Sequence, residues 1–336
     1  MQRHVLITGG CGFIGSHMAE ALLSRRDHVT LIDDLSTGSI KNIDHFRDNK
    51  DLEVRLGDIQ TSESDSMLRM EIDRADLVYH FAAAVGVFNI VNDPTGTLEK
   101  NIGITSKVLK YTSLKKKPVL LTSTSEVYGK RVDGLFKETD DLILGPTYNF
   151  RWSYAASKIV DEFLALAYWK EHKLPVVIVR LFNTIGPRQT GQYGMVVPRM
   201  IEQALTNEPI TVFGTGQQTR CFTDIADVVR AFIILPDKEE AWGKIVNIGG
   251  NHSISILDLA KKIKEMTEST SEISIIPYSQ AYEPGFEDML HRAPDISLAN
   301  QLMNWHPEIS LDQTLQRMIR YTRERSQYRS TQPVTP

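Results

Sequence analysis

Tyr154 and Lys158 are the two residues whose types and spacing most directly suggest chemistry. They stand four positions apart on a predicted helix, so their side chains share one face of it. A lysine ammonium there favours the phenolate and is expected to lower the pKa of the phenol. A phenol that exchanges a proton near neutral pH is a general acid or base. We therefore predict a catalytic pair, although the same spacing also occurs in ordinary helices.

A second group of reactive side chains precedes this pair. The run Leu121-Thr-Ser-Thr-Ser-Glu-Val-Tyr-Gly129 is predicted to be the end of a strand that continues into a loop. It presents the hydroxyls of Thr124 and Ser125 and the carboxylate of Glu126. We predict that these three side chains join the pair in one site. Glu126 could instead cap a helix or lie on the surface.

A glycine-rich turn lies near the amino terminus. Gly9, Gly12 and Gly15 stand between the apolar run Val5–Thr8 and a predicted helix over residues 16–25. Strand, glycine turn and helix in this order are the context that a dinucleotide fingerprint requires. The glycines allow a tight turn, close approach of a pyrophosphate and close helix packing, and the helix amino terminus faces the phosphates.

Asp33 ends the second predicted strand, about twenty residues after the turn. A carboxylate in that position accepts hydrogen bonds from the adenosine ribose hydroxyls and repels a 2′-phosphate. NAD is therefore predicted as the cofactor in preference to NADP. Asp58, after the third strand, could accept from the adenine amine or cap a helix.

Strands and helices alternate through the first half of the chain. Six strands are predicted, over residues 5–8, 28–32, 52–56, 76–81, 118–122 and 176–180. Such alternation predicts an α/β fold, a doubly wound, Rossmann-type parallel sheet, with ligands at the carboxyl ends of the strands. We expect an NAD-binding domain over 1–185, a smaller, partly interleaved substrate-binding lobe over 186–325, and a flexible tail over 326–336.

The composition excludes several other classes. Of 336 residues, 41% are hydrophobic and 24% charged, as in an ordinary globular protein, and the net charge of −4 gives no reason to expect nucleic acid. Two cysteines, Cys11 and Cys221, lie far apart, so no metal site is predicted. No signal peptide or membrane-spanning run is expected, which predicts the cytoplasm.

With these motifs in view, the chain resembles the extended short-chain dehydrogenases that modify nucleotide-sugars, over about residues 4–323. The resemblance rests on five motifs in order: Thr8-Gly-Gly-Cys-Gly-Phe-Ile-Gly15, Asp33, Asp58-Ile59, Tyr154xxxLys158 and Gly214…Thr219-Arg220…Asp224.

The resemblance implies a role for each site residue. Tyr154 would take the proton of the sugar 4-hydroxyl, Thr124 would bond the 4-oxygen, and Lys158 would bind the nicotinamide ribose. Cofactor contacts are expected from Gly9, Gly12, Phe13, Ile14, Gly15, Asp33, Asp58, Ile59, Ala82, Asn101, Tyr154 and Lys158. Substrate contacts are expected from Asn183, Arg188, Val197, Arg220 and Arg292.

The sequence Thr124-Ser125-Glu126 distinguishes between branches of the family. Dehydratases typically have Thr-Asp-Glu at these positions, and many epimerases have only small or hydroxyl residues. The Thr-Ser-Glu of this chain resembles the segment of UDP-glucuronate decarboxylases. The segment His291–Ile296 resembles the decarboxylases too, and its Arg292 would lie near the sugar carboxylate, unless it pairs with Asp295 or Glu287 on the surface. Residues 142–152 resemble the decarboxylase of aminoarabinose synthesis, whereas 84–90 and 186–194 resemble epimerases.

The expected activity is that of a UDP-glucuronate decarboxylase acting through a transient 4-keto sugar, in which Glu126 and Arg292 position the carboxylate and supply a proton. A UDP-sugar 4-epimerase is the alternative, and a 4,6-dehydratase or a non-catalytic NAD-binding protein is less favoured. The resemblance also implies a homodimer in which two long helices, about 93–112 and 152–173, form a four-helix bundle with their counterparts.

Overall fold

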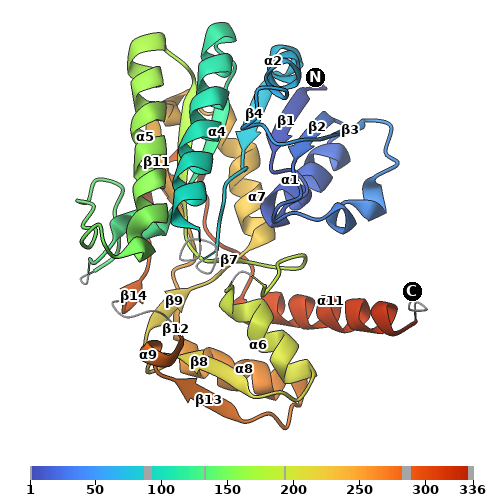
Figure 1. The fold of residues 1–336 in the computed structure, drawn as a ribbon, viewed down its shortest axis with the longest axis vertical. Helices are drawn as coiled ribbons and strands as arrows, with labels where there is room; N and C mark the ends of the chain where they lie inside the picture. Colours follow the sequence, from blue (N-terminus) through green and yellow to red (C-terminus); the bar gives the residue numbers. More distant parts are fainter. Residues whose placement is uncertain (1, 87–92, 132–133, 193, 282–288, 332–336) are drawn as a thin grey trace.

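The computed structural model describes residues 2–86, 93–131, 134–192, 194–281 and 289–331. Its centre is a seven-stranded parallel sheet with the order β11-β6-β5-β4-β1-β2-β3 (Figure 1). The strands of this sheet are β1 His4–Thr8, β2 His28–Asp33, β3 Leu52–Leu56, β4 Leu77–His80, β5 Val119–Thr124, β6 Val176–Leu181 and β11 Lys244–Ile248. The predicted doubly wound α/β fold is confirmed.

Helices cover both faces of this sheet, which explains why its strands are apolar throughout. Helices α2 Asp65–Arg74, α4 Pro94–Lys115 and α5 Ser153–His172 pack on one face. Helices α1 Phe13–Ser24, α7 Ile225–Ile234 and α10 Ser297–Met303 pack on the other. Val5, Leu6 and Ile7 are each 0% exposed as a result.

Local signals set the helix boundaries. Asp93 caps α4 by accepting a hydrogen bond from the Gly96 amide, and Pro94 occupies the first turn, where it costs no hydrogen bond. Ser255 caps α8 Ile256–Thr267 in the same way through the Asp258 amide. Both long helices, α4 and α5, end at a residue in the left-handed conformation, Lys116 and Lys173.

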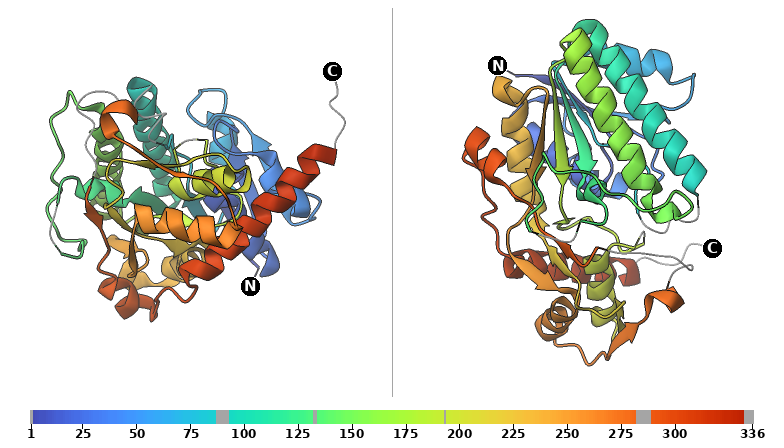
Figure 2. Two further views of the ribbon diagram at one scale, coloured as in Figure 1. Left: turned by 90° about the horizontal axis from the view of Figure 1, so that it is seen from below. Right: turned by 90° about the vertical axis from the view of Figure 1, so that its left-hand side faces the viewer.

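A smaller lobe lies beneath the carboxyl ends of the strands, at the foot of Figure 1 and in both views of Figure 2. Its helices are α6 Val196–Leu205, α8 Ile256–Thr267, the short α9 Tyr278–Ala281 and α11 Leu311–Thr331. Its short strands are β7 Thr184–Ile185, β8 Ile210–Phe213, β9 Thr219–Cys221, β10 Thr223–Asp224, β12 Ser253–Ser255, β13 Ile273–Ile276 and β14 His291–Arg292. Apolar residues of α6, α8, α11 and β8 form a separate core.

The two parts are interleaved in sequence. Strand β11 and helices α7 and α10 lie within residues 186–325 but complete the sheet and cover one face of it. The flexible tail predicted over 326–336 overlaps the end of α11, which continues to Thr331, and its flexibility stays a prediction. A polar sequence is compatible with a helix, and the first proline is Pro333, which lies outside the described residues.

No helix in the described part of the chain combines the length and the apolar character needed to cross a membrane. The cytoplasmic location stays a prediction.

Candidate active site

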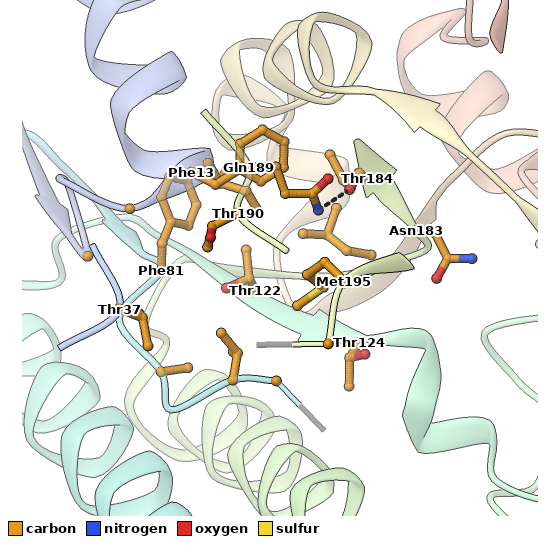
Figure 3. A pocket seen from close by; sticks show the side chains of 18 of the residues that line it. Phe13, Thr37, Phe81, Thr122, Thr124, Asn183, Thr184, Gln189, Thr190 and Met195 are labelled. Carbon is orange, nitrogen blue, oxygen red and sulfur yellow. Dashed lines mark hydrogen bonds between the residues drawn. The ribbon is translucent and has the colours of Figure 1, made fainter. Parts of the chain in front are cut away.

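The carboxyl ends of the central strands open into one cavity of about 710 Å³ between the sheet and the smaller lobe. Figure 3 shows part of its lining: Thr122 and Thr124 from β5, Asn183 after β6, and Phe13 beside the glycine turn. Every predicted site residue except Asn101 lines this cavity. Parallel strands deliver their carboxyl ends to the same edge of a sheet, so residues from distant parts of the chain meet here.

The glycine turn forms one end of the cavity. A Cβ atom at Gly15 would lie 2.2 Å from the Gly9 carbonyl oxygen, and one at Gly9 would lie 2.8 Å from the Ala82 amide nitrogen. The turn therefore packs directly on the end of β4 and excludes larger residues. Among the described residues, no side chain caps the amino terminus of α1, and its first turn contains no acid. Its amides and helix dipole thus suit an anion.

Asp33 lies beside this turn, at the end of β2. Its Oδ2 accepts from the Cys11 amide at 2.9 Å, and its Oδ1 accepts from the Leu35 amide at 2.8 Å. Burial raises the pKa of Asp33, and these two amides oppose that shift. Each oxygen keeps a lone pair for another donor. The glycine turn and this acid together fit the pyrophosphate and ribose of a dinucleotide.

Asn101, which was predicted as a cofactor contact, lies outside the lining of the cavity. Its side-chain oxygen accepts from the Ala84 amide at 2.7 Å, and its nitrogen donates to the Ser157 hydroxyl at 3.2 Å. Asn101 therefore ties the segment after β4 to α4 and α5. Residues 87–90 of the epimerase-like segment lie outside the described residues.

Tyr154 and Lys158 are presented by the first turns of α5, which a buried polar network anchors to the sheet. Glu162, farther along α5, accepts from Arg180 of β6 at 2.9 and 2.7 Å and from the Ser123 hydroxyl of β5 at 2.5 Å. Because these partners are buried, the network fixes α5 against the strand ends. Tyr154 thereby comes within hydrogen-bonding reach of the Thr124 side chain.

Lys158 forms an ion pair with a second residue of α5. Its ammonium donates to the Asp161 carboxylate at 2.8 Å, and both side chains are buried. Burial raises the pKa of Tyr154, the charges of Glu126 and Asp161 raise it further, and the bond with Thr124 opposes them. In this arrangement the phenol is a weaker acid than free tyrosine, mainly because it is buried.

Glu126 lies between two arginines at the other side of the cavity. Arg151 lies 2.5 Å from its Oε2, and Arg292 donates to its Oε1. Arg292 also donates to the Asn183 side chain at 2.8 Å. Burial alone would raise the pKa of Glu126, but the arginines outweigh it and bring the pKa to about 2. Glu126 is therefore ionised near neutral pH, and its predicted part in supplying a proton stays a prediction.

Two arginines predicted to bind a diphosphate also line the cavity. Arg188 pairs with Glu20 of α1, and Arg220 donates to the carbonyls of Thr219 and Met289 at 2.8 Å. Val197 contributes an apolar surface from α6. The arginines remain candidates for anion binding because each guanidinium has five N–H donors.

Two charged residues of the site were not predicted from the sequence. Arg151 precedes Tyr154 by three positions, and Asp161 follows Lys158 by three. One helical turn separates the members of each pair, and this spacing was the available signal.

Comparison with known proteins agrees with this geometry. The family model described as GDP-mannose 4,6 dehydratase matches residues 6–318. The chain belongs to this family. Its membership confirms the predicted extended short-chain dehydrogenase of the nucleotide-sugar epimerase and dehydratase type.

Individual relatives cover nearly the whole chain. A UDP-N-acetyl-alpha-D-glucosaminuronate decarboxylase from Bacillus cytotoxicus is 39% identical, over 96% of this chain and 99% of its own. UDP-glucuronic acid decarboxylase 1 from Xenopus tropicalis is 32% identical, over 100% of this chain and 76% of its own. The UDP-glucuronic acid 4-epimerase from Bacillus cereus, solved with UDP-glucuronic acid and NAD, is 30% identical with a TM-score of 0.85, over 96% of this chain and 99% of its own.

Proposed function

We propose that this protein is an NAD-dependent decarboxylase of a UDP-linked hexuronate. The observation that carries the proposal is the cluster Arg151–Glu126–Arg292 in the cavity that Tyr154 also lines. Two guanidinium groups and one carboxylate leave a net charge of +1. A second carboxylate, that of a hexuronate substrate, would balance it. Arginine forks suit carboxylates because they donate two parallel hydrogen bonds.

The cavity residues can divide the reaction between them. Bound NAD would accept hydride from C4 of the sugar and return it to the product. Tyr154 would take the proton of the 4-hydroxyl, and Thr124, its hydrogen-bond partner, would hold the 4-oxygen. Oxidation at C4 makes the C6 carboxylate part of a β-keto acid.

Loss of carbon dioxide then needs mainly orientation. The bond between C5 and C6 breaks, and its electron pair moves into the 4-ketone to form an enolate. Arg292 would orient the carboxylate, and Ser125 lines the cavity beside Glu126. A proton from solvent water would add at C5. Hydride returned to C4, with the proton that Tyr154 returns to the 4-oxygen, would then complete a UDP-pentose. Release before reduction would give the 4-keto-pentose.

The similar proteins support this function and leave two substrates to distinguish. The Bacillus cytotoxicus relative is named for a 2-acetamido hexuronate, and the Xenopus relative for UDP-glucuronate. We infer that the smaller lobe, with Arg188 and Arg220, holds the nucleotide diphosphate of either one.

Purified protein with NAD and each substrate labelled with ¹³C at C6 tests the proposal. Labelled carbon dioxide from either substrate supports decarboxylation. A 4-epimer without labelled carbon dioxide would show a 4-epimerase instead, which the Bacillus cereus structure makes the second candidate. Tyr154→Phe should reduce turnover by at least about 10²-fold while NAD binding persists. Unchanged turnover in that variant would argue against a catalytic phenol.

We also propose a homodimer that pairs α4 and α5 with their counterparts. On α5, Phe163 is 69% exposed and Val160 is 39% exposed, although both are large and apolar. Helices α4 and α5 lie side by side on the outer face of the sheet (Figures 1 and 2). An exposed apolar surface on paired helices suits a matching surface on a second copy.

A further inference from the structure

Asp161 is a buried acid beside the catalytic pair whose role the reaction does not explain. It lies one turn after Lys158 on α5, is 0% exposed, and accepts from the Lys158 ammonium at 2.8 Å. The next residue, Glu162, is also buried, but it is committed to Arg180 and Ser123. Helix α5 thus buries two acids in succession, one that anchors the helix and one that faces the site lysine.

We propose that Asp161 is a positioning residue for proton transfer: its carboxylate holds and neutralises the Lys158 ammonium and thereby limits how strongly that ammonium favours the Tyr154 phenolate. The inference deepens the proposed function, because it rests on Tyr154 as the group that takes the proton.

Among the described residues, Asp161 is the acid that forms an ion pair with Lys158. From β4, His80 faces Lys158, but it hydrogen-bonds with Thr8 and Thr105, and burial followed by the Lys158 charge lowers its pKa to about 3. His80 is therefore neutral. From the loop after β5, Glu126 acts on Tyr154 but is bound by Arg151 and Arg292.

The ion pair has an electrostatic consequence for the phenol. An ammonium beside a phenol favours the phenolate, whereas an ammonium already paired with a carboxylate has little net field. The pKa of Tyr154 is raised by burial, then by the charges of Glu126 and Asp161. Removing the Asp161 charge would leave Lys158 as an uncompensated cation and make Tyr154 a stronger acid.

The test measures the titration of Tyr154 directly. Protein labelled with 3-fluorotyrosine is titrated by ¹⁹F NMR, with and without NAD, and Tyr154→Phe identifies the resonance. In Asp161→Asn, the titration of Tyr154 should begin at a pH lower by at least about one unit, a tenfold change in acid strength. A titration that coincides with that of the wild type would overturn the proposal.

Two further variants distinguish an electrostatic effect on the pKa of Tyr154 from a general loss of stability. Asp161→Glu keeps the charge, so its titration should return toward that of the wild type. Glu71→Gln removes another buried acid, which lies on α2 outside the cavity lining and pairs with Arg55 of β3 and Arg74 of α2. That variant should leave the Tyr154 titration unchanged. A shift of equal size in Glu71→Gln would show a general effect of instability and would overturn the proposal.

Two measures keep the test valid if Asp161→Asn is unstable. Excess NAD stabilises the folded state of any variant that binds it. If Asp161→Asn does not fold, Asp161→Ser removes the same charge and leaves room for water to solvate the Lys158 ammonium, and the same shift is expected. The NMR titration needs no substrate. If Asp161→Asn shifts the titration but the wild type turns over neither substrate, the proposed function is overturned and only the electrostatic coupling between Asp161 and Tyr154 stands.

Discussion

Arg151 and Glu126 form an ion pair at the edge of the active-site cavity, with 2.5 Å between the guanidinium nitrogen and the carboxylate oxygen. The side chains are only 4% and 15% exposed. Arg151 also lies over the ring of Trp152, with its central carbon 5.5 Å from the ring centroid. The residue three positions before the predicted catalytic tyrosine thus binds one oxygen of Glu126, while Arg292 of the smaller lobe binds the other.

Arg151→Met should therefore damage both stability and turnover. The change leaves Glu126 with one partner, and breaking a buried ion pair costs roughly 3 kcal/mol. Misplacement of Glu126, and with it of the substrate carboxylate, should lower kcat/KM at least about 10²-fold. Urea unfolding and steady-state rates measure the two effects. Arg3→Met is the matched control: Arg3 pairs with Asp237, is 40% exposed, and should change stability by less than about 1 kcal/mol. Equal effects in both variants would contradict the assigned role.

Glu126 should make stability depend on pH in an acidic window. Its pKa is about 2 in the folded protein and about 4.3 in an unfolded chain, so the folded state binds this proton less readily. The stabilisation is present above about pH 4.3 and is lost as the pH falls towards 2, with a total of roughly 3 kcal/mol. In Glu126→Gln the free energy of unfolding should fall less steeply across this window. Parallel curves for the two proteins would show that Glu126 is not held as a carboxylate.

Gly15→Ala should abolish dinucleotide binding. The new Cβ would lie 2.2 Å from the Gly9 carbonyl oxygen, and neither backbone segment can yield without opening the turn. We expect NAD affinity, measured by calorimetry, to fall at least about 10²-fold. Gly103→Ala on α4 is the control, because a Cβ there meets nothing within 4 Å. It should retain NAD binding and gain up to about 1 kcal/mol of stability.

Phe163→Asp should shift the protein from dimer to monomer. A charge placed in the proposed apolar contact would have to be desolvated in the dimer. Light scattering coupled to size-exclusion chromatography measures the mass. Phe150→Asp provides the comparison, since Phe150 is 53% exposed but lies outside α4 and α5. A monomeric wild type, or equal masses for the wild type and Phe163→Asp, would exclude this interface.

Local sequence signals were sufficient to predict the first strands of the sheet and the glycine turn. The apolar runs before Gly9 and before Asp33 predicted β1 and β2 to within one residue at each end. The turn of Gly9, Gly12 and Gly15 was predicted because its backbone requirements are short-range. The end of α11 at Thr331 was not predicted, because a polar sequence is compatible with both a frayed end and a helix.

The hydrogen-bond partners of Asn101 could not be predicted from a sequence motif. Its place on α4 was predicted, but the partner of its amide depends on how α4 packs against α5 and the segment after β4. That packing turns the side chain away from the cavity and into a structural contact.

The sequence by itself determined the α/β fold, the glycine turn and the spacing of Tyr154 and Lys158, because each depends on periodicity or on neighbours within a few residues. Only the tertiary structure decided the charge states. Glu126 and Arg292 are 166 residues apart in the chain and meet because β5 and β14 end at the same cavity. Whether Glu126 is ionised and whether Lys158 is neutralised by Asp161 follow from burial and from the distances between charges, which exist only once the chain is folded.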